Sequence, residues 1–152
     1  MPFFRPNEGR IWTQMKKLLL FTLAALATSA LAEEVFFEYN GKQYPATLLD
    51  NSYAQALLKR APLTMSFEDL GKSERISYLK YPLPLTREKF DYTPKKGDIA
   101  YWAPRRNLTV FMDEPTYKAQ LVPIGHVAPE TLEMIRTSQS WLMTLVRKTE
   151  KK

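Results

Sequence analysis

The sequence predicts a small, mainly β domain that closes into an antiparallel barrel and carries two short helices. Three observations lead to this prediction: many short strand-like runs, tight-turn signals between neighbouring runs, and helix signals at only two separated positions. Seven or eight predicted strands in one open sheet would leave two exposed edges, and closure into a barrel removes them. We expect this domain to span residues 33–152.

A hairpin opens the domain and is the strongest local signal. Two β-prone runs, 35–39 and 42–48, flank the pair Asn40-Gly41. Asn-Gly tolerates the positive φ angles that a two-residue hairpin turn requires at both central positions. The sequence therefore predicts a two-residue turn here.

A short helix and two further strands follow the hairpin. Polar residues at 50–52 are candidate N-caps for a helix through Leu58, and Pro62 ends it because proline lacks an N–H. Apolar and polar residues alternate over 63–67 and, less regularly, over 76–78, which predicts strands. The proline-rich segment 81–94 is long for a loop in a compact domain, so it is a candidate for a functional role.

The second half repeats the same kinds of signal. A second hairpin is predicted over 97–112, and a strand over 122–127. Pro129 and Glu130 mark the first turn of a second helix, which continues through Ile135. The tail 140–147 fits a strand or the end of that helix, and its Trp, Thr and Val residues favour the strand.

Residues 15–32 have the three regions of a secretory signal peptide. Lys16-Lys17 are positive, 18–27 is apolar, and Ala30-Leu31-Ala32 supplies the small residues that signal peptidase requires. The alternative is an uncleaved membrane anchor, but the apolar run is far shorter than the roughly 20 residues that span a bilayer. We therefore expect an exported protein, periplasmic or secreted, with no stable membrane span after cleavage. Residues 1–14 are interpreted as an upstream extension from an early start codon.

Composition excludes several classes of function. Four of the 22 basic and one of the 16 acidic residues precede Glu33, which leaves a net charge of +3 without a long basic block, so no nucleic-acid partner is expected. With no cysteine and one histidine, neither a closed zinc site nor a two-histidine catalytic metal site is available, and we expect no metal and no cofactor. His126 is the single imidazole base, and no Gly-x-Ser-x-Gly turn presents a nucleophile.

Three segments resemble the bacterial cyclophilin-like fold family. They are Gly97-Asp98-Ile99-Ala100-Tyr101-Trp102-Ala103-Pro104 with the strand 108–111 after it, the stretch 121–127, and the helix-then-strand stretch 54–67 with the residues that follow it. The resemblance covers residues 34–146. It implies a closed eight-stranded barrel capped by two helices.

The resemblance raises the question of prolyl isomerase activity. Cyclophilins proper seat a proline ring in an apolar pocket and aim an arginine guanidinium at the prolyl nitrogen, which weakens the amide resonance. The matching stretch here contains Arg75 but lacks the Phe-His-Arg strand and the Gln-Gly-Gly run of true cyclophilins, so no catalytic set can be transferred. Arg75 is a candidate ligand-facing group, and the alternative is a solvated strand arginine beside Glu74.

Three more residues are candidate ligand contacts. Tyr101 and Phe111 lie on the second hairpin, where alternate aromatics could line a cleft, although such residues are more often core. Because side chains alternate along a strand, only one of Tyr101 and Trp102 can face inward. His126 could titrate near neutral pH, or be an ordinary surface residue.

Two functions remain open at this stage. The first is a non-catalytic binding module for a peptide or a small molecule, and the second is a peptidyl-prolyl isomerase acting on exported proteins. The missing isomerase residues favour the first, because a fold does not by itself confer an activity.

The leader yields a direct prediction. The mature protein should begin at Glu33, because signal peptidase cleaves after small residues such as Ala32. N-terminal sequencing of exported material measures this. Recovery of an intact chain from Met15 in a membrane fraction would show an anchor instead.

Overall fold

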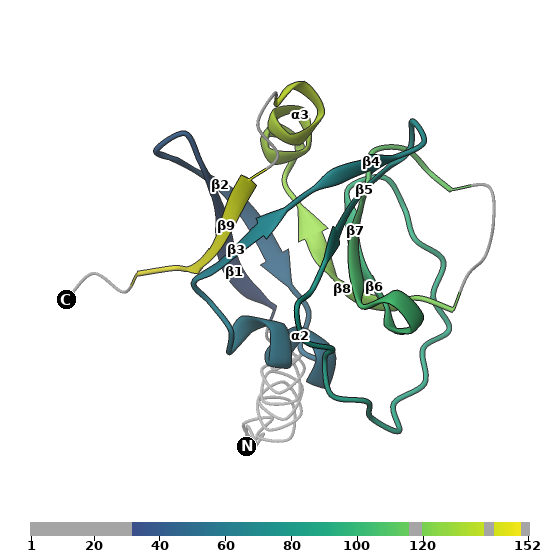
Figure 1. Cartoon of the computed structure of the whole chain (residues 1–152). Helices are drawn as coiled ribbons and strands as arrows, with labels where there is room; N and C mark the ends of the chain where they lie inside the picture. Colours follow the sequence, from purple (N-terminus) through teal and green to yellow (C-terminus); the bar gives the residue numbers. More distant parts are fainter. Residues whose placement is uncertain (1–31, 116–119, 139–141, 150–152) are drawn as a thin grey trace, which may run out of the picture.

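The computed structural model describes residues 32–115, 120–138 and 142–149. Within these residues one antiparallel sheet of nine strands curves into a barrel, and two α-helices lie at its opposite ends (Figure 1). The strands are β1 (Glu33–Tyr39), β2 (Lys42–Leu48), β3 (Leu63–Ser66), β4 (Glu68–Leu70), β5 (Glu74–Tyr78), β6 (Asp98–Trp102), β7 (Asn107–Phe111), β8 (Val122–Val127) and β9 (Leu142–Arg147). The helices are α2 (Ser52–Leu58) and α3 (Pro129–Thr137), and a 3-10 turn, η1 (Ala103–Arg105), joins β6 to β7.

The barrel is nearly closed by one bent run of chain. The strand order is β3-β9-β1-β2-β8-β6-β7-β5-β4, so β3 and β4 stand at the two ends of the sheet. Only Phe67 separates them in sequence, which means that the run 63–70 pairs with β9 through its first half and with β5 through its second. If β3 and β4 are counted as one bent strand, the barrel has eight strands, as the family resemblance implied. The sheet is interrupted at Phe67.

The hairpin and helix signals of the sequence are confirmed. Asn40 and Gly41 adopt φ angles of 49° and 74°, as the two-residue turn requires. The side chain of Asn51 caps α2 by accepting a hydrogen bond from the Ala54 N–H at 2.9 Å. Pro129 occupies the first turn of α3. No helix in the described ranges is long and apolar enough to cross a membrane.

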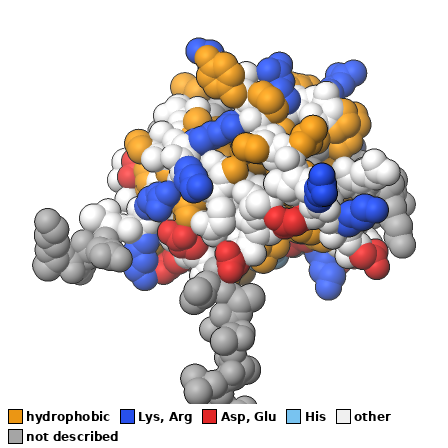
Figure 2. Space-filling model, turned by 90° about the horizontal axis from the view of Figure 1, so that it is seen from below, with side chains coloured by type: hydrophobic (Ala, Val, Ile, Leu, Met, Phe, Trp, Pro, Cys, Tyr) orange, Lys and Arg blue, Asp and Glu red, His pale blue; other side chains and the backbone are white. Residues whose placement is uncertain are grey.

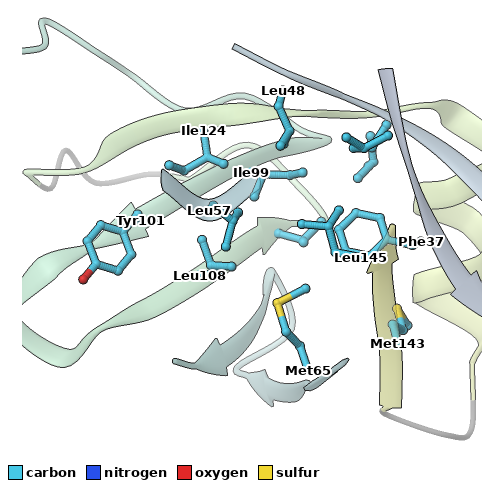
Figure 3. Close-up of a cluster of buried hydrophobic side chains, with 14 of the residues drawn as sticks. Phe37, Leu48, Leu57, Met65, Ile99, Tyr101, Leu108, Ile124, Met143 and Leu145 are labelled. Carbon is cyan, nitrogen blue, oxygen red and sulfur yellow. The ribbon is translucent and has the colours of Figure 1, made fainter. Parts of the chain in front are cut away.

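The main core fills the barrel and draws on nearly every element around it. Figure 3 shows Phe37, Leu48, Leu57, Met65, Ile99, Tyr101, Leu108, Ile124, Met143 and Leu145 packed together. Helix α2 closes one end with Tyr53, Ala54, Leu57 and Leu58, and α3 covers the other with Thr131, Leu132, Met134 and Ile135. The interior is thus occupied by side chains, and space for a ligand must lie outside it.

The long loop between β5 and β6 has no regular structure, as predicted, but it is attached at several points. The N–H of Leu83 donates to the Tyr101 hydroxyl oxygen at 3.1 Å, and the N–H of Thr86 donates to that of Tyr53 at 3.1 Å. Leu83 itself is buried in the main core. These contacts hold the first half of the loop against the α2 end of the barrel.

Two strands differ from the sequence-based expectation, and the tail agrees with it. Strand β4 was not predicted, because all three of its side chains are exposed and it has no hydrophobic alternation. Strand β5 begins at Glu74, two residues before the predicted strand 76–78. Its first four residues are all buried, so the sequence shows no alternation of apolar and polar residues there. The tail is a strand over Leu142–Arg147, and residues 140 and 141 lie outside the described residues.

Phe67 gives a testable prediction about closure. It is buried at the junction of β3 and β4, and its ring meets Phe37 edge-on with 6.4 Å between centroids. Phe67→Ala should lower the free energy of unfolding by about 3–5 kcal/mol in a urea titration, since the cavity would lie where the barrel closes. Tyr81→Ala, at an exposed aromatic, should change it by no more than about 0.5 kcal/mol. Equal effects would contradict this role of Phe67.

Candidate ligand-binding groove

A groove of about 300 Å³ lies on the outer face of the barrel, over strands β5, β7 and β6. Its lining combines outward-facing strand residues with residues from β4, η1 and the segment before β8. The lining residues are Leu70, Glu74, Ile76, Tyr78, Trp102, Arg105, Asn107, Thr109, Phe111 and Leu121.

Strand register explains why these residues meet. Glu74 pairs with Phe111, Ile76 with Thr109, and Tyr78 with Asn107, while Trp102 pairs with Asn107 from the other side. Paired residues on antiparallel strands point to the same face, so successive rows cross the groove. The groove therefore follows from alternation along three neighbouring strands, with no contribution from the barrel interior.

The floor of the groove is unusually apolar for the outside of a barrel. Phe111 is 1% exposed and packs with Ala100 and Leu121 in a second cluster, separate from the main core. Trp102 and Tyr92 pack against the same cluster. The sequence left Phe111 open between core and cleft. It is buried, but in this outer cluster beside Trp102, because it lies on the opposite face of the sheet from Tyr101. Apolar residues gathered on an outer face are typical of a binding surface.

Polar groups stand at both ends of this floor. Glu74 is buried at the end next to Phe111, and Asn107 is buried at the other end, near Arg105. The Asn107 Oδ1 atom is buried, and no described residue donates a hydrogen bond to it. A buried acceptor without a donor lowers the stability of the folded protein by about 1–3 kcal/mol. A ligand N–H that donated to Asn107 Oδ1 would remove this cost.

A second polar constellation centres on Asp98 at the start of β6. Its Oδ2 accepts hydrogen bonds from the Tyr92 hydroxyl at 2.8 Å and from the Lys95 N–H at 2.9 Å. Its Oδ1 lies 2.8 Å from Nδ1 of His126. Burial raises the pKa of Tyr92, and the hydrogen bond to Asp98 and that carboxylate's charge raise it further. Tyr92 is therefore a neutral donor that fastens the end of the loop to the barrel.

The residues predicted as ligand contacts are not brought together. Phe111 lines the groove. Arg75 lies on the opposite face of β5, where its Nε donates to Asp69 Oδ1 and its Nη1 to Ser138 Oγ, both at 2.9 Å. It is buried, so the alternative of a solvated strand arginine is wrong.

Tyr101 and His126 lie elsewhere as well. Tyr101 is fully buried in the main core, while its neighbour Trp102 faces the groove, which confirms that only one of the pair points inward. His126 is an outward-facing side chain held by Asp98, and it is not part of the groove lining.

Sequence reasoning missed Asn107, Glu74 and Thr109. These polar residues lie in strands whose residues are almost all buried, so no alternation marks them as outward-facing. The sequence signal nearest to this site is Arg105-Arg106 at the hairpin tip together with Trp102, because Trp102 and Arg105 line one end of the groove. The polar lining required the strand register.

Comparison with known proteins identifies the family. Residues 37–145, more than two thirds of the chain, match the cyclophilin-like family. The chain therefore belongs to the cyclophilin-like family.

One solved structure supports the fold. The solution structure of the hypothetical protein AF2241 from Archaeoglobus fulgidus matches with a TM-score of 0.57 and 12% sequence identity, over 81% of this chain and 100% of that one. At this identity the likeness concerns the fold alone. No match is found among the curated proteins. Within the described ranges, no three His, Cys, Asp or Glu side chains cluster in a way that could hold a metal ion.

Tyr92 provides a prediction about alkaline pH. Its pKa in the folded protein lies above its ordinary value of about 10, so the stability that the neutral phenol contributes is present below about pH 10 and is lost as the pH rises further. We expect Tyr92→Phe to lose less stability than the wild type between pH 9 and about pH 11, measured by urea unfolding. Tyr81→Phe, at an exposed position, should follow the wild type. Parallel curves for all three proteins would contradict the contact.

Proposed function

We propose that this protein is a non-catalytic binding module that holds a peptide or a small molecule in the groove on its outer face. The observation that carries the proposal is the apolar floor around Phe111 together with the unpaired Asn107 Oδ1 in the same lining. Ligand sites are commonly concave and apolar, with a few polar groups that fix orientation. This groove has that composition.

The lining defines what such a ligand should offer. An apolar group would lie over the buried floor and pack against Leu70 and Tyr78, which are 52% and 51% exposed, so apolar surface is removed from water on both sides. An N–H group, as in a peptide backbone, would donate to Asn107 Oδ1. Arg105 is exposed at the rim and adds a cation beside Trp102.

Binding should depend on the groove rim. Leu70→Ser removes a 52% exposed leucine that lines the groove, so it should weaken a peptide or fragment found by NMR screening about fivefold, through lost apolar contact. Leu142→Ser is the matched control, because Leu142 is 58% exposed and lies outside the groove. Asn107→Ala should weaken a ligand that donates an N–H by about tenfold.

Titrations followed by amide chemical shifts measure these affinities, and the shifts should centre on β5, β6 and β7. Equal affinities of the Leu70 and Leu142 variants, or shifts that centre on another face, would contradict the groove as the site. A screen of peptides and fragments that yields no groove binder would contradict the function itself.

The alternative function is a peptidyl-prolyl isomerase acting on exported proteins. It requires a guanidinium held against a desolvated apolar pocket. Arg75 is turned away from the groove and engaged with Asp69 and Ser138, and Arg105 is exposed at the rim. These positions favour the binding module.

We therefore expect X-Pro isomerisation in a test peptide to keep its uncatalysed timescale of tens of seconds at 25 °C when this protein is added. A protease-coupled or NMR exchange assay on the wild type, Arg75→Ala and Arg105→Ala measures this. Strong acceleration by the wild type that is lost in either arginine variant would establish the isomerase instead.

Export of this module, to the periplasm or outside the cell, is part of the proposal. Its support is the three-part leader at 15–32, which lies outside the described residues. The N-terminal sequencing described above tests it.

A further inference from the structure

The end of the barrel that α2 covers carries cations gathered around the start of the long loop. Arg60 donates from Nη1 to the Tyr81 carbonyl and from Nη2 to the Pro82 carbonyl, each at 2.6 Å. Arg106 donates from Nη1 to the Lys80 carbonyl at 3.0 Å. The Lys80 ammonium lies 5.3 Å from the centroid of the Tyr81 ring. Three positive side chains therefore gather at the three-residue segment 80–82.

Carboxylates do not neutralise these three cations in the described part of the chain. The ion pairs found there involve Arg75, His126, Arg136 and Lys148. Arg60 and Arg106 use backbone carbonyls instead, which satisfies hydrogen bonds without cancelling charge. Glu88 and Asp91 are the acidic residues of the same loop, and Glu88 accepts a hydrogen bond from the Ser52 N–H at 3.2 Å. The segment around residues 80–82 therefore keeps a local positive charge.

The same end exposes large apolar side chains. Leu85 is 80% exposed and Tyr81 is 63% exposed, the two highest values among the exposed large hydrophobic residues of the described ranges. Leu85 is held at this end because the neighbouring Thr86 hydroxyl lies 3.3 Å from that of Ser52, on α2. Figure 2, which views the molecule from below, shows Lys and Arg side chains interspersed with hydrophobic ones, while Asp and Glu side chains lie in the lower half of the same view.

We propose that this face, the basal patch of Arg60, Lys80, Tyr81, Leu85 and Arg106, docks on the surface of an anionic phospholipid bilayer. Lysine and arginine are attracted to anionic headgroups, while tyrosine and leucine enter the boundary between headgroups and acyl chains. A soluble polyanion would engage the cations and would gain little from Leu85. The combination of unneutralised cations with protruding apolar side chains is what selects a lipid surface.

The position of the chain entry point agrees with this orientation. Glu33, where β1 begins, lies at the α2 end of the barrel (Figure 1). The apolar residues 18–27 precede it in the sequence. A membrane that held the leader would lie on the side of the basal patch. After cleavage, the patch alone would keep the α2 end of the protein turned toward the membrane.

Vesicle binding tests the proposal with residues 33–152, which hold the whole sheet and both helices; the same fold constitutes the whole of the matched archaeal structure. Phosphatidylglycerol vesicles should sediment the protein at low ionic strength, and phosphatidylcholine vesicles should not. The paired change Lys59→Gln and Lys80→Gln should weaken binding at least about tenfold, since each lysine near an anionic surface contributes a factor of about five. Lys80 belongs to the basal patch, Lys59 follows α2 directly and adjoins Arg60 in the chain, and both lysines are exposed.

The matched control is the paired change Lys42→Gln and Lys72→Gln. It removes the same charge from exposed lysines at the start of β2 and in the β4–β5 turn, at the other end of the barrel, and should leave binding unchanged. Tyr81→Ser with Leu85→Ser should weaken vesicle binding and leave retention on heparin, a soluble polyanion, unchanged. Absence of phosphatidylglycerol binding would overturn the proposal. Equal losses in the two lysine pairs, or full vesicle binding by the Tyr81 and Leu85 variant, would also overturn it, because either result indicates charge attraction without a docked face.

Discussion

The whole barrel depends on one bend in one stretch of chain. The run from β3 to β4 pairs with β9 before Phe67 and with β5 after it, so a single buried ring stands where the two ends of the sheet meet. Closure there brings β5 beside β7 as an internal strand rather than an edge. The groove depends on this arrangement, because the three adjacent strands β5, β7 and β6 supply its floor. A sheet left open at Phe67 would present β4 and β5 as a loose edge and would lose one wall of the groove.

Alternation then separates two roles within the same short strands. In β5, Glu74, Ile76 and Tyr78 face the groove, while Arg75 faces the opposite side. In β6, Trp102 faces the groove and Tyr101 the core. Each strand therefore contributes side chains both to the inner face of the sheet and to the candidate site. Residues that are neighbours in sequence lie in different environments.

Local chemistry made most of the fold predictable. Asn40-Gly41, the Asn51 cap, Pro129 and the second hairpin each depend on residues within a few positions of one another, and all were placed correctly. The candidate site was much less predictable. Asn107 and Glu74 belong to it through pairing between distant strands, and burial on both faces of β5 and β7 erased the alternation that would have shown their direction. The position of Arg75 was not predictable, because it is set by hydrogen bonds to Asp69 on β4 and to Ser138 at the end of α3.

Arg75 connects the paired strands β4 and β5 with the end of α3. Its guanidinium contacts Asp69 on β4 and Ser138 just beyond α3, while its backbone belongs to β5. Leu70 and Glu74, which flank this contact on the same two strands, form one wall of the groove. The arginine thus braces that wall from behind. A substitution at Arg75 would therefore change the shape of the groove, although Arg75 is not one of its lining residues.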